Sequence, residues 1–216
     1  METNCNIRTA TLDDIDFVVE TIINAEKYGT DTCGFANTFG LSINEAEMII
    51  KQMLEEEIDG CEFSIDSFHI LEVSGKPVAA IAAWIEGQNS SDQPSSILKS
   101  NLISFIMPKD KINHASTMAS AISGIQIDRT ENSLQFEYGY CRPEYRGHGF
   151  ISKLFIDCIE KSDAHIIELQ TFGEDTPAIR LYKKLGFVIT KKFVSDDPET
   201  IKYFPSNKKV LMTFKK

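Results

Sequence analysis

The residues best suited to chemistry in this 216-residue chain lie in one glycine-containing segment between two apolar patterns. An aromatic, β-rich run ends at Pro143, and a pattern of helical period begins near Gly149. The first turn of a helix has N–H groups without intrahelical partners, and its dipole favours negative charge. Glycine lets an anion approach these groups closely, so the segment predicts a pyrophosphate-binding loop. Its expected members are Arg146, which adds positive charge, Gly147, His148, Gly149, Phe150 and Ile151.

Two well-known phosphate-binding loops do not fit this segment. A dinucleotide fingerprint requires a third glycine where Ser152 stands, and a Walker-type loop requires Gly-Lys-Ser/Thr, which the chain lacks. Taken alone, the segment is also compatible with an ordinary turn between a strand and a helix.

A second segment, residues 175–187, predicts a short amphipathic helix. Thr176 suits the N-cap position, Pro177 suits the first helical position, and Gly186 is placed to end the helix. The apolar face repeats at helical spacing through Ala178, Leu181, Tyr182 and Leu185.

Together the two segments resemble the signatures of the GNAT superfamily of N-acetyltransferases, in that family's order and with a strand-like segment between them. The first pattern is Arg or Gln, two residues, Gly, one residue, then Gly or Ala. Arg146, Gly149 and Ile151 occupy those places, and Ile151 departs from the usual small residue. The second is Ala-x-x-Leu-Tyr closing with Gly-Phe. The family usually has Asn three residues before that Ala, where this chain has Asp175.

The resemblance implies a fold, a co-substrate and several roles. The expected fold is α/β, the GNAT (acyl-CoA N-acyltransferase) fold, with a mixed central sheet flanked by helices. Acetyl-CoA is the implied acyl donor. Cys141, through its main chain, and Arg142 match the strand end that holds the pantetheine arm and thioester, and Asp175 matches a cofactor contact. Tyr182 matches the tyrosine that donates a proton to the departing thiolate; an ordinary core tyrosine is the alternative.

A base is also needed, because an amine arrives as a cation and must lose a proton. Glu137 is the best candidate, since it lies on the strand that leads into the loop. Strict alternation would place Glu137 with Gly139 and Cys141 on one face, and Tyr138 and Tyr140 on the other. If the Glu137 face is not the acceptor side, the residue is a surface charge. Glu168 on the following strand is a weaker candidate.

Composition narrows the remaining classes of function. The net charge is -10, which disfavours nucleic-acid binding and favours approach of cationic amines, although solubility alone explains it equally well. No apolar run is long enough to span a membrane, and residues 1–8 lack a signal-peptide core. The five cysteines are scattered without a Cys-x-x-Cys pair, so we expect free thiols in a cytoplasmic protein and no metal site.

We expect a single domain over residues 1–216 with an atypical helical insertion at 87–132. Helices are predicted near 12–27, 43–58, 95–107, 110–124 and 149–162, with a loop over 28–41. Strands are predicted at 6–10, 61–73, 77–86, 134–141, 165–171, 187–194 and 208–214. Long insertions are often lids or binding loops, but a packing elaboration or an oligomer contact fits this one equally well.

These observations predict an N-acetyltransferase that moves an acetyl group from acetyl-CoA to a primary amine, by direct transfer in a ternary complex. The amine belongs to a small molecule or to a protein. The sequence does not decide whether the protein forms a homodimer. A non-catalytic acyl-CoA-binding or regulatory module on the same fold is the alternative, favoured by Ile151 and Asp175 and opposed by Tyr182.

Overall fold

The protein is a mixed α/β structure in a computed structural model that describes residues 5–216. One seven-stranded sheet has the order β1-β2-β3-β4-β5-β7-β6 and is antiparallel except where β4 pairs with β5. Its strands are β1 (Cys5–Thr9), β2 (Phe68–Val73), β3 (Lys76–Ile85), β4 (Leu134–Cys141), β5 (Ile166–Phe172), β6 (Val188–Val194) and β7 (Lys208–Lys215). Antiparallel hairpins with few crossover helices confirm the expected mixed sheet and exclude a doubly wound one.

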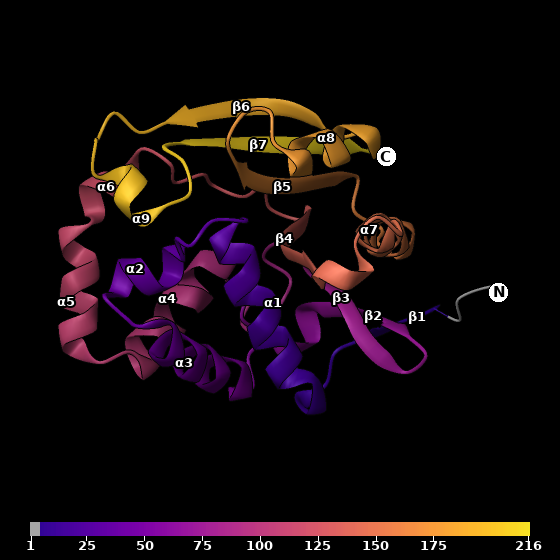
Figure 1. The fold of residues 1–216 in the computed structure, drawn as a ribbon, viewed down its shortest axis with the longest axis horizontal. Coiled ribbons are helices and arrows are strands. Elements are labelled where there is room, and N and C mark those ends of the chain that lie inside the picture. The colour runs from indigo at the N-terminus through magenta and orange to yellow at the C-terminus, as the bar shows by residue number, and fades with distance from the viewer. Residues whose placement is uncertain (1–4) are drawn as a thin grey trace.

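Helices cover both faces of the sheet (Figure 1). The α-helices are α1 (Ile15–Lys27), α2 (Gly34–Phe39), α3 (Ile43–Glu55), α4 (Ser95–Ile106), α5 (Lys109–Thr117), α6 (Ala119–Ser123), α7 (Phe150–Lys161), α8 (Pro177–Lys184) and α9 (Thr200–Tyr203). Three short 3-10 turns are η1 (Leu12–Asp14), η2 (Ile65–Ser67) and η3 (Pro143–Tyr145). Among the described residues, no helix is long and apolar enough to cross a lipid bilayer.

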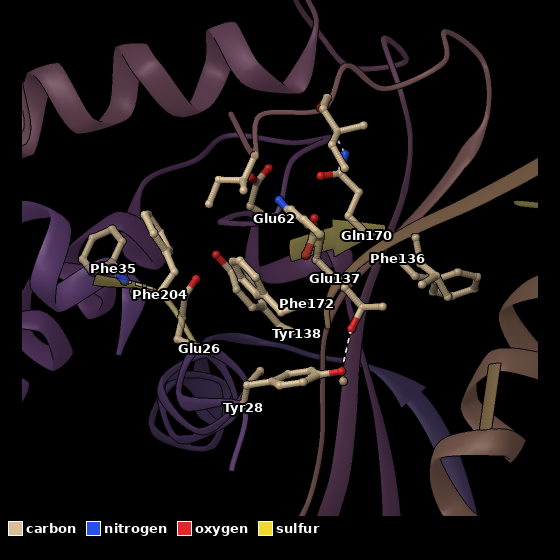
Figure 2. Close-up of a pocket in the computed structure, with 18 of the residues that line it drawn as sticks. Glu26, Tyr28, Phe35, Glu62, Phe136, Glu137, Tyr138, Gln170, Phe172 and Phe204 are labelled. Carbon is tan, nitrogen blue, oxygen red and sulfur yellow. Dashed lines mark hydrogen bonds between the residues drawn. The ribbon is translucent and has the colours of Figure 1, made fainter. Parts of the chain in front are cut away.

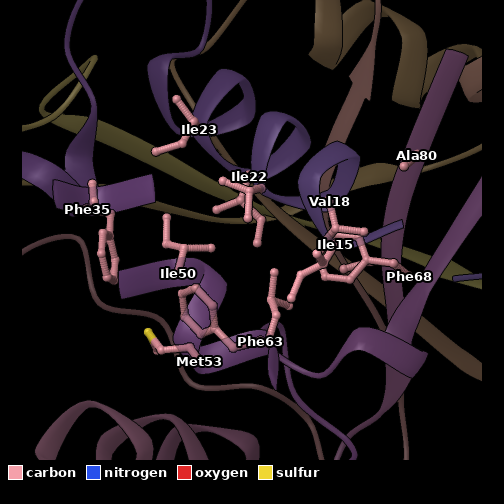
Figure 3. Close-up of a cluster of buried hydrophobic side chains, with 14 of the residues drawn as sticks. Ile15, Val18, Ile22, Ile23, Phe35, Ile50, Met53, Phe63, Phe68 and Ala80 are labelled. Atoms are coloured by element: carbon pink, nitrogen blue, oxygen red, sulfur yellow. The ribbon is translucent and has the colours of Figure 1, made fainter. Parts of the chain in front are cut away.

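Two apolar clusters hold these layers together. In the first, the apolar stripe of α1 packs on α3 and on the sheet, with Val18, Ile22 and Ile50 fully buried (Figure 3). In the second, α7 packs on the other face, where Leu154 and Phe155 meet the strands. Burying such side chains stabilises the fold by about 1.5–3 kcal/mol each, which makes the sheet a rigid support for the loops at its edge.

Local sequence signals explain most of the element boundaries. The capping box that opens α3 is present, because Ser42 Oγ accepts from the Glu45 N–H and Glu45 Oε2 accepts from the Ser42 N–H. Thr176 Oγ1 caps α8 by accepting from the Ile179 N–H at 3.2 Å. Gly186 follows α8 with a positive φ of 97°, as a helix-ending glycine does.

The structure corrects three of the predicted elements and adds one short helix. Residues 28–41 contain the short helix α2, which the polar Gly- and Thr-rich composition hides. Residues 61–67 form turns and η2, so the strand predicted from residue 61 begins at Phe68. The helix predicted at 110–124 is broken at Met118 into α5 and α6, and a short helix, α9, lies in the connection before the last strand.

The centre of β4 is irregular. Ala82 pairs with Glu137 and Ala80 pairs with Tyr140, so two residues of β4 lie opposite Ile81 alone. Tyr138, one of the two, has a positive φ of 53°, which is strained for a bulky side chain. Tyr138 and Tyr140 pack in the α1 cluster and Cys141 packs in the α7 cluster, as predicted. The β-bulge makes the predicted alternation wrong for Glu137, because its pairing partner Ala82 packs in the α1 cluster, on the face opposite to Cys141.

The parallel pairing of β4 with β5 is short. It joins Leu134–Phe136 to Ile167–Leu169 and then stops, although both strands continue. Beyond that point the two strands separate, which opens the sheet between its two helical layers.

Candidate active site

A cavity of about 430 Å³ occupies the opening between β4 and β5. Phe136 and Leu169, the last paired residues, line it, and so do the residues that follow each of them along its strand. Phe155 and Tyr182 line the cavity from the α7 side of the sheet, whereas the rings of the α1 cluster line it from the other side. The cavity therefore connects the two faces of the sheet at one place.

The helical insertion forms part of the cavity wall. Its lining residues are Ser96, Lys99, Ile103, Ile122, Ile125, Gln126, Ile127 and Arg129. The insertion also packs on the core through Leu102 and Met107. The insertion therefore lines the cavity and also packs on the core, and its role as a binding element stays a prediction.

Tyr182 presents a free phenol to this cavity. Its ring is fixed by Phe155 and Phe187, with centroids 5.3 and 6.3 Å away. Its hydroxyl makes no hydrogen bond with any residue from 5 to 216, unlike that of a satisfied core tyrosine. Burial, with a smaller contribution from the neighbouring Tyr28, raises the pKa of Tyr182 well above its usual value, so the phenol keeps its proton.

Glu137 lies in the same cavity, on the α1 side of the bulge. Its Oε1 accepts from Arg129 Nη2 at 3.1 Å, and the side chain is 21% exposed. The residue is therefore not the surface charge that the sequence left open. Glu168, the weaker candidate for the base, does not line the cavity. The Glu168 carboxylate is buried and accepts hydrogen bonds from Thr130 and Gln135.

A buried charge network fixes Glu137. Arg129 also binds Glu62, whose carboxylate is only 2% exposed and takes a second ion pair from Lys99 at 2.6 Å. Burial alone would raise the pKa of Glu62, but the two cations outweigh it and lower that pKa to about 2. Arg129 stacks over the ring of Trp84 at 4.9 Å, which further restricts its guanidinium.

The predicted phosphate loop follows the C-terminal end of the central strand β4 and is exposed. Gly147 and Gly149 have φ values of 82° and 74°, which other residues adopt only with strain. Gly149 is the N-cap of α7 and supplies no side-chain hydrogen bond, so the first-turn N–H groups at Phe150 and Ile151 stay available to an anion. His148 stacks on Phe150 with the centroids 5.5 Å apart. These features fit the diphosphate of an acyl-CoA.

The two arginines of this region differ in their partners. Arg146 donates through Nε to the Cys141 carbonyl at 3.1 Å and forms no ion pair within residues 5–216. Arg142 is bound to α1: two of its nitrogens donate to Glu20, the closer contact being 2.5 Å, and its guanidinium lies 4.7 Å from the ring of Phe17. Its charge is therefore neutralised, and Arg146 remains as the available cation of the loop.

Two other predicted cofactor contacts lie apart from the cavity. Cys141 packs in the α7 cluster, and burial raises the pKa of its thiol, so the thiol stays protonated and acts as a small apolar group. Asp175 is 76% exposed and pairs with Arg180 at 3.1 Å. Thr176, not Asp175, caps the following helix.

Several cavity residues escaped the sequence reasoning. Glu26 ends a helix that reads as ordinary, and Lys209 lies in the terminal strand. The aromatic residues of the cavity are scattered: Tyr28, Phe35, Phe39, Phe63, Phe172 and Phe204. Their only sequence signal is the high phenylalanine count of 14, which does not say where the rings meet.

Within residues 5–216, one group of side chains that could ligate a metal lies outside the cavity. Ligand atoms of His69, Asp157 and Cys158 are within 4.8 Å of one another. Lys161 already pairs with Asp157 at 2.8 Å, and burial raises the pKa of Cys158 to about 12. A protonated thiol and an occupied carboxylate are poor metal ligands.

Solved structures support the fold. An N-acetyltransferase from Staphylococcus aureus Mu50 superposes with a TM-score of 0.70 at 14% identity, covering 97% of this chain and 100% of that one. An agmatine N-acetyltransferase mutant gives 0.56 at 10% identity over 98% and 99% of the two chains. The ribosomal-protein-S18-alanine N-acetyltransferase from Escherichia coli gives 0.52 at 13% identity over 98% and 94%.

The sequence itself matches a family model. No curated protein matches the chain by sequence. The model of the acetyltransferase (GNAT) family matches residues 42–187, which is more than half of the chain and includes β4, the phosphate loop and α8. The fold, the glycine loop and the sequence match agree, and the chain belongs to the acetyltransferase (GNAT) family, whose members are acyltransferases.

Proposed function

We propose that this acyltransferase is an N-acetyltransferase that moves an acetyl group from acetyl-CoA to a primary amine by direct transfer in a ternary complex. One observation carries the proposal: the cavity through the sheet brings the free hydroxyl of Tyr182 and the carboxylate of Glu137 to the same space. A proton donor and a proton acceptor on either side of the reacting carbonyl are what aminolysis of a thioester requires.

The donor side is assigned to the phosphate loop. Arg146 and the N–H groups of Gly147, His148, Gly149, Phe150 and Ile151 bind the diphosphate in this proposal. Main-chain groups near Cys141 and Arg142 align the pantetheine arm, and Asp175 lies at its far side as a weaker contact. The opening between β4 and β5 then admits the thioester to the cavity.

The chemical step uses two side chains. Glu137, directly or through water, accepts the proton that the amine loses as its nitrogen bonds to the carbonyl carbon. Tyr182 donates its proton to the sulfur as the carbon–sulfur bond breaks, so no thiolate leaves unprotonated. General acid–base assistance of this kind contributes about 10²- to 10⁴-fold to rates.

The acceptor, the compartment and the assembly are also proposals. The named acceptors of two fold neighbours are agmatine and the alanine of a ribosomal protein, so the fold alone does not choose between a small molecule and a protein. A cytoplasmic location, no membrane or nucleic-acid partner, no metal and a possible homodimer follow from the composition and the family resemblance.

Calorimetry with coenzyme A and a thiol-release assay over a panel of amines test the proposal together. We expect CoA to bind, and acetyl-CoA to release its thiol only when an amine is present. Binding with no release on any amine would support the non-catalytic module instead. Absence of CoA binding would contradict both the N-acetyltransferase and the non-catalytic acyl-CoA-binding module.

A further inference from the structure

The ionisable groups of the cavity do not all have partners. Glu62 and Glu137 are paired with Lys99 and Arg129. Glu26, at the C-terminal end of α1, faces the same cavity, and within residues 5–216 it forms no ion pair. An unpaired carboxylate on the wall of a binding cavity is costly unless a ligand satisfies it.

A backbone N–H of α2 holds the Glu26 carboxylate in place. Its Oε2 accepts from the Phe35 N–H at 3.0 Å, and no other hydrogen bond to Glu26 occurs among the described residues. A Cβ on Gly34 would lie 2.8 Å from Oε2 and 3.2 Å from the ring of Phe204. The missing side chain at Gly34 therefore makes the room in which the carboxylate and the ring lie together.

Aromatic rings surround this carboxylate (Figure 2). Phe35 contacts Phe63 with centroids 5.8 Å apart, and Phe63 contacts Tyr138 at 6.0 Å. Phe204 stacks on Phe172 at 5.9 Å. A carboxylate with aromatic rings close by is a combination that binds organic cations, at about 0.5–2 kcal/mol for each ring that the cation contacts.

We propose that the acceptor is a small diamine: its reacting amine lies at Glu137 and Tyr182, and its second, cationic group is bound by Glu26 among these rings. Figure 2 shows Glu26 with Phe35 and Phe204 at one end of the cavity and Phe136 at the other, with Glu137 between them. The carbon chain of the acceptor would pass Tyr138 and Phe172, which line the cavity. This inference rests on the proposed function, because it names the substrate of the same cavity.

The surroundings of Glu26 also affect its protonation. Burial raises the pKa of Glu26, with Glu137 adding to the effect and the Phe35 N–H opposing it. A bound cation restores the ionised form. Among the described residues that line the cavity, Lys209 is the other charged residue without an ion pair, and its Nζ lies 5.6 Å from the ring centroid of Phe172. Burial lowers the pKa of Lys209, which reduces its repulsion of a second cation.

Matched acceptors test the inference. Butylamine and 1,4-diaminobutane have the same carbon chain and differ only in the second amine. A charge-assisted hydrogen bond is worth about 1.5–3 kcal/mol, so we expect kcat/KM for the diamine to exceed that for the monoamine by about 10- to 100-fold. Glu26→Gln keeps the size of the side chain and its bond to the Phe35 N–H, and we expect it to reduce this ratio to below about threefold.

A control variant distinguishes the effect of the Glu26 charge in the cavity from the effect of the net charge of the protein. Glu47→Gln removes one charge from the exposed face of α3, and we expect the diamine-to-monoamine ratio to stay as in the unaltered protein. Equal kcat/KM for the two amines, or a ratio that survives Glu26→Gln, overturns the inference and leaves the proposed function intact.

Binding provides a second readout that does not need turnover. We expect calorimetry to detect 1,4-diaminobutane binding, weakened about tenfold or more by Glu26→Gln. Binding of this kind with no thiol release on any amine would retain the cation site and reject the proposed function. No detectable diamine binding together with turnover of a peptide amine would overturn the diamine in favour of a protein acceptor.

Discussion

Replacing Tyr182 with phenylalanine separates the chemistry of the phenol from the packing of its ring. The ring contacts with Phe155 and Phe187 do not involve the hydroxyl. The hydroxyl has no hydrogen-bond partner within residues 5–216, so its removal leaves no buried donor or acceptor without a partner. We therefore expect Tyr182→Phe to change the free energy of unfolding by less than about 0.5 kcal/mol.

The expected effect on the reaction is much larger. Loss of a positioned proton donor costs about 10²- to 10⁴-fold, or roughly 2.7–5.5 kcal/mol of transition-state stabilisation. The loss should fall on kcat, because the phenol acts on the departing sulfur and not on the diphosphate. Since burial raises the pKa of Tyr182 above 10, the unaltered protein should show no alkaline loss of kcat from this group below pH 10.

Three measurements on one variant complete the test: thiol release at saturating substrates, CoA calorimetry and urea unfolding. Tyr203→Phe in α9 is the matched control, because Tyr203 does not line the cavity and its change should leave kcat unaltered. A kcat for Tyr182→Phe within about threefold of the unaltered protein would refute the reasoning. So would a loss of CoA binding equal to the loss of rate, since the ring would then be acting through the fold.

Four further predictions rest on other contacts. Arg146→Ala should weaken CoA binding about tenfold in calorimetry without changing the thermal midpoint, because the exposed guanidinium has no ion-pair partner among residues 5–216; an unchanged Kd would remove Arg146 from the diphosphate site. Glu62→Gln should destabilise the fold by about 3 kcal/mol in urea, because it removes the carboxylate partner of Lys99 and one of the two carboxylates that pair with the buried Arg129. The pKa of Glu62 in the fold, about 2, is below its usual 4.5, so its contribution to stability is present above pH 5 and is lost as pH falls toward 2; urea unfolding that shows no such acid loss would contradict the pairing. Gly34→Ala should raise KM for amine acceptors and leave the Kd for CoA unchanged, because its methyl group would displace the Glu26 carboxylate and the Phe204 ring; equal effects on both ligands would indicate general unfolding instead.

Much of the fold could be predicted where short-range chemistry sets the structure. Capping residues place the starts of α3 and α8, and the apolar stripe of α1 identifies its buried face. The prediction failed where tertiary contacts override local preference. The helix α2 is only six residues long and polar in part, yet Phe35 and Phe39 are buried in the α1 cluster and stabilise it.

The candidate site likewise has one part that could be predicted from the sequence and one part that could not. The phosphate loop and Tyr182 could be identified because glycine, basic and helix-capping residues lie at fixed spacings within a few residues of each other. The acceptor side could not, because Glu26, Arg129 and Lys209 come from three distant parts of the chain. The face occupied by Glu137 was also undetermined, since one extra residue in β4 shifts the alternation on which that inference depends.

The sequence by itself determined the order of the strands and of the longer helices, the glycine turn before α7 and the presence of a tyrosine on α8, because hydrogen bonds and steric limits between near neighbours decide these features. Only the tertiary structure decided that β4 and β5 separate, that the insertion lines the resulting cavity, and that a carboxylate without a cationic partner lies among aromatic rings. Those features depend on the packing of segments far apart along the chain, and no local pattern encodes the distance between them.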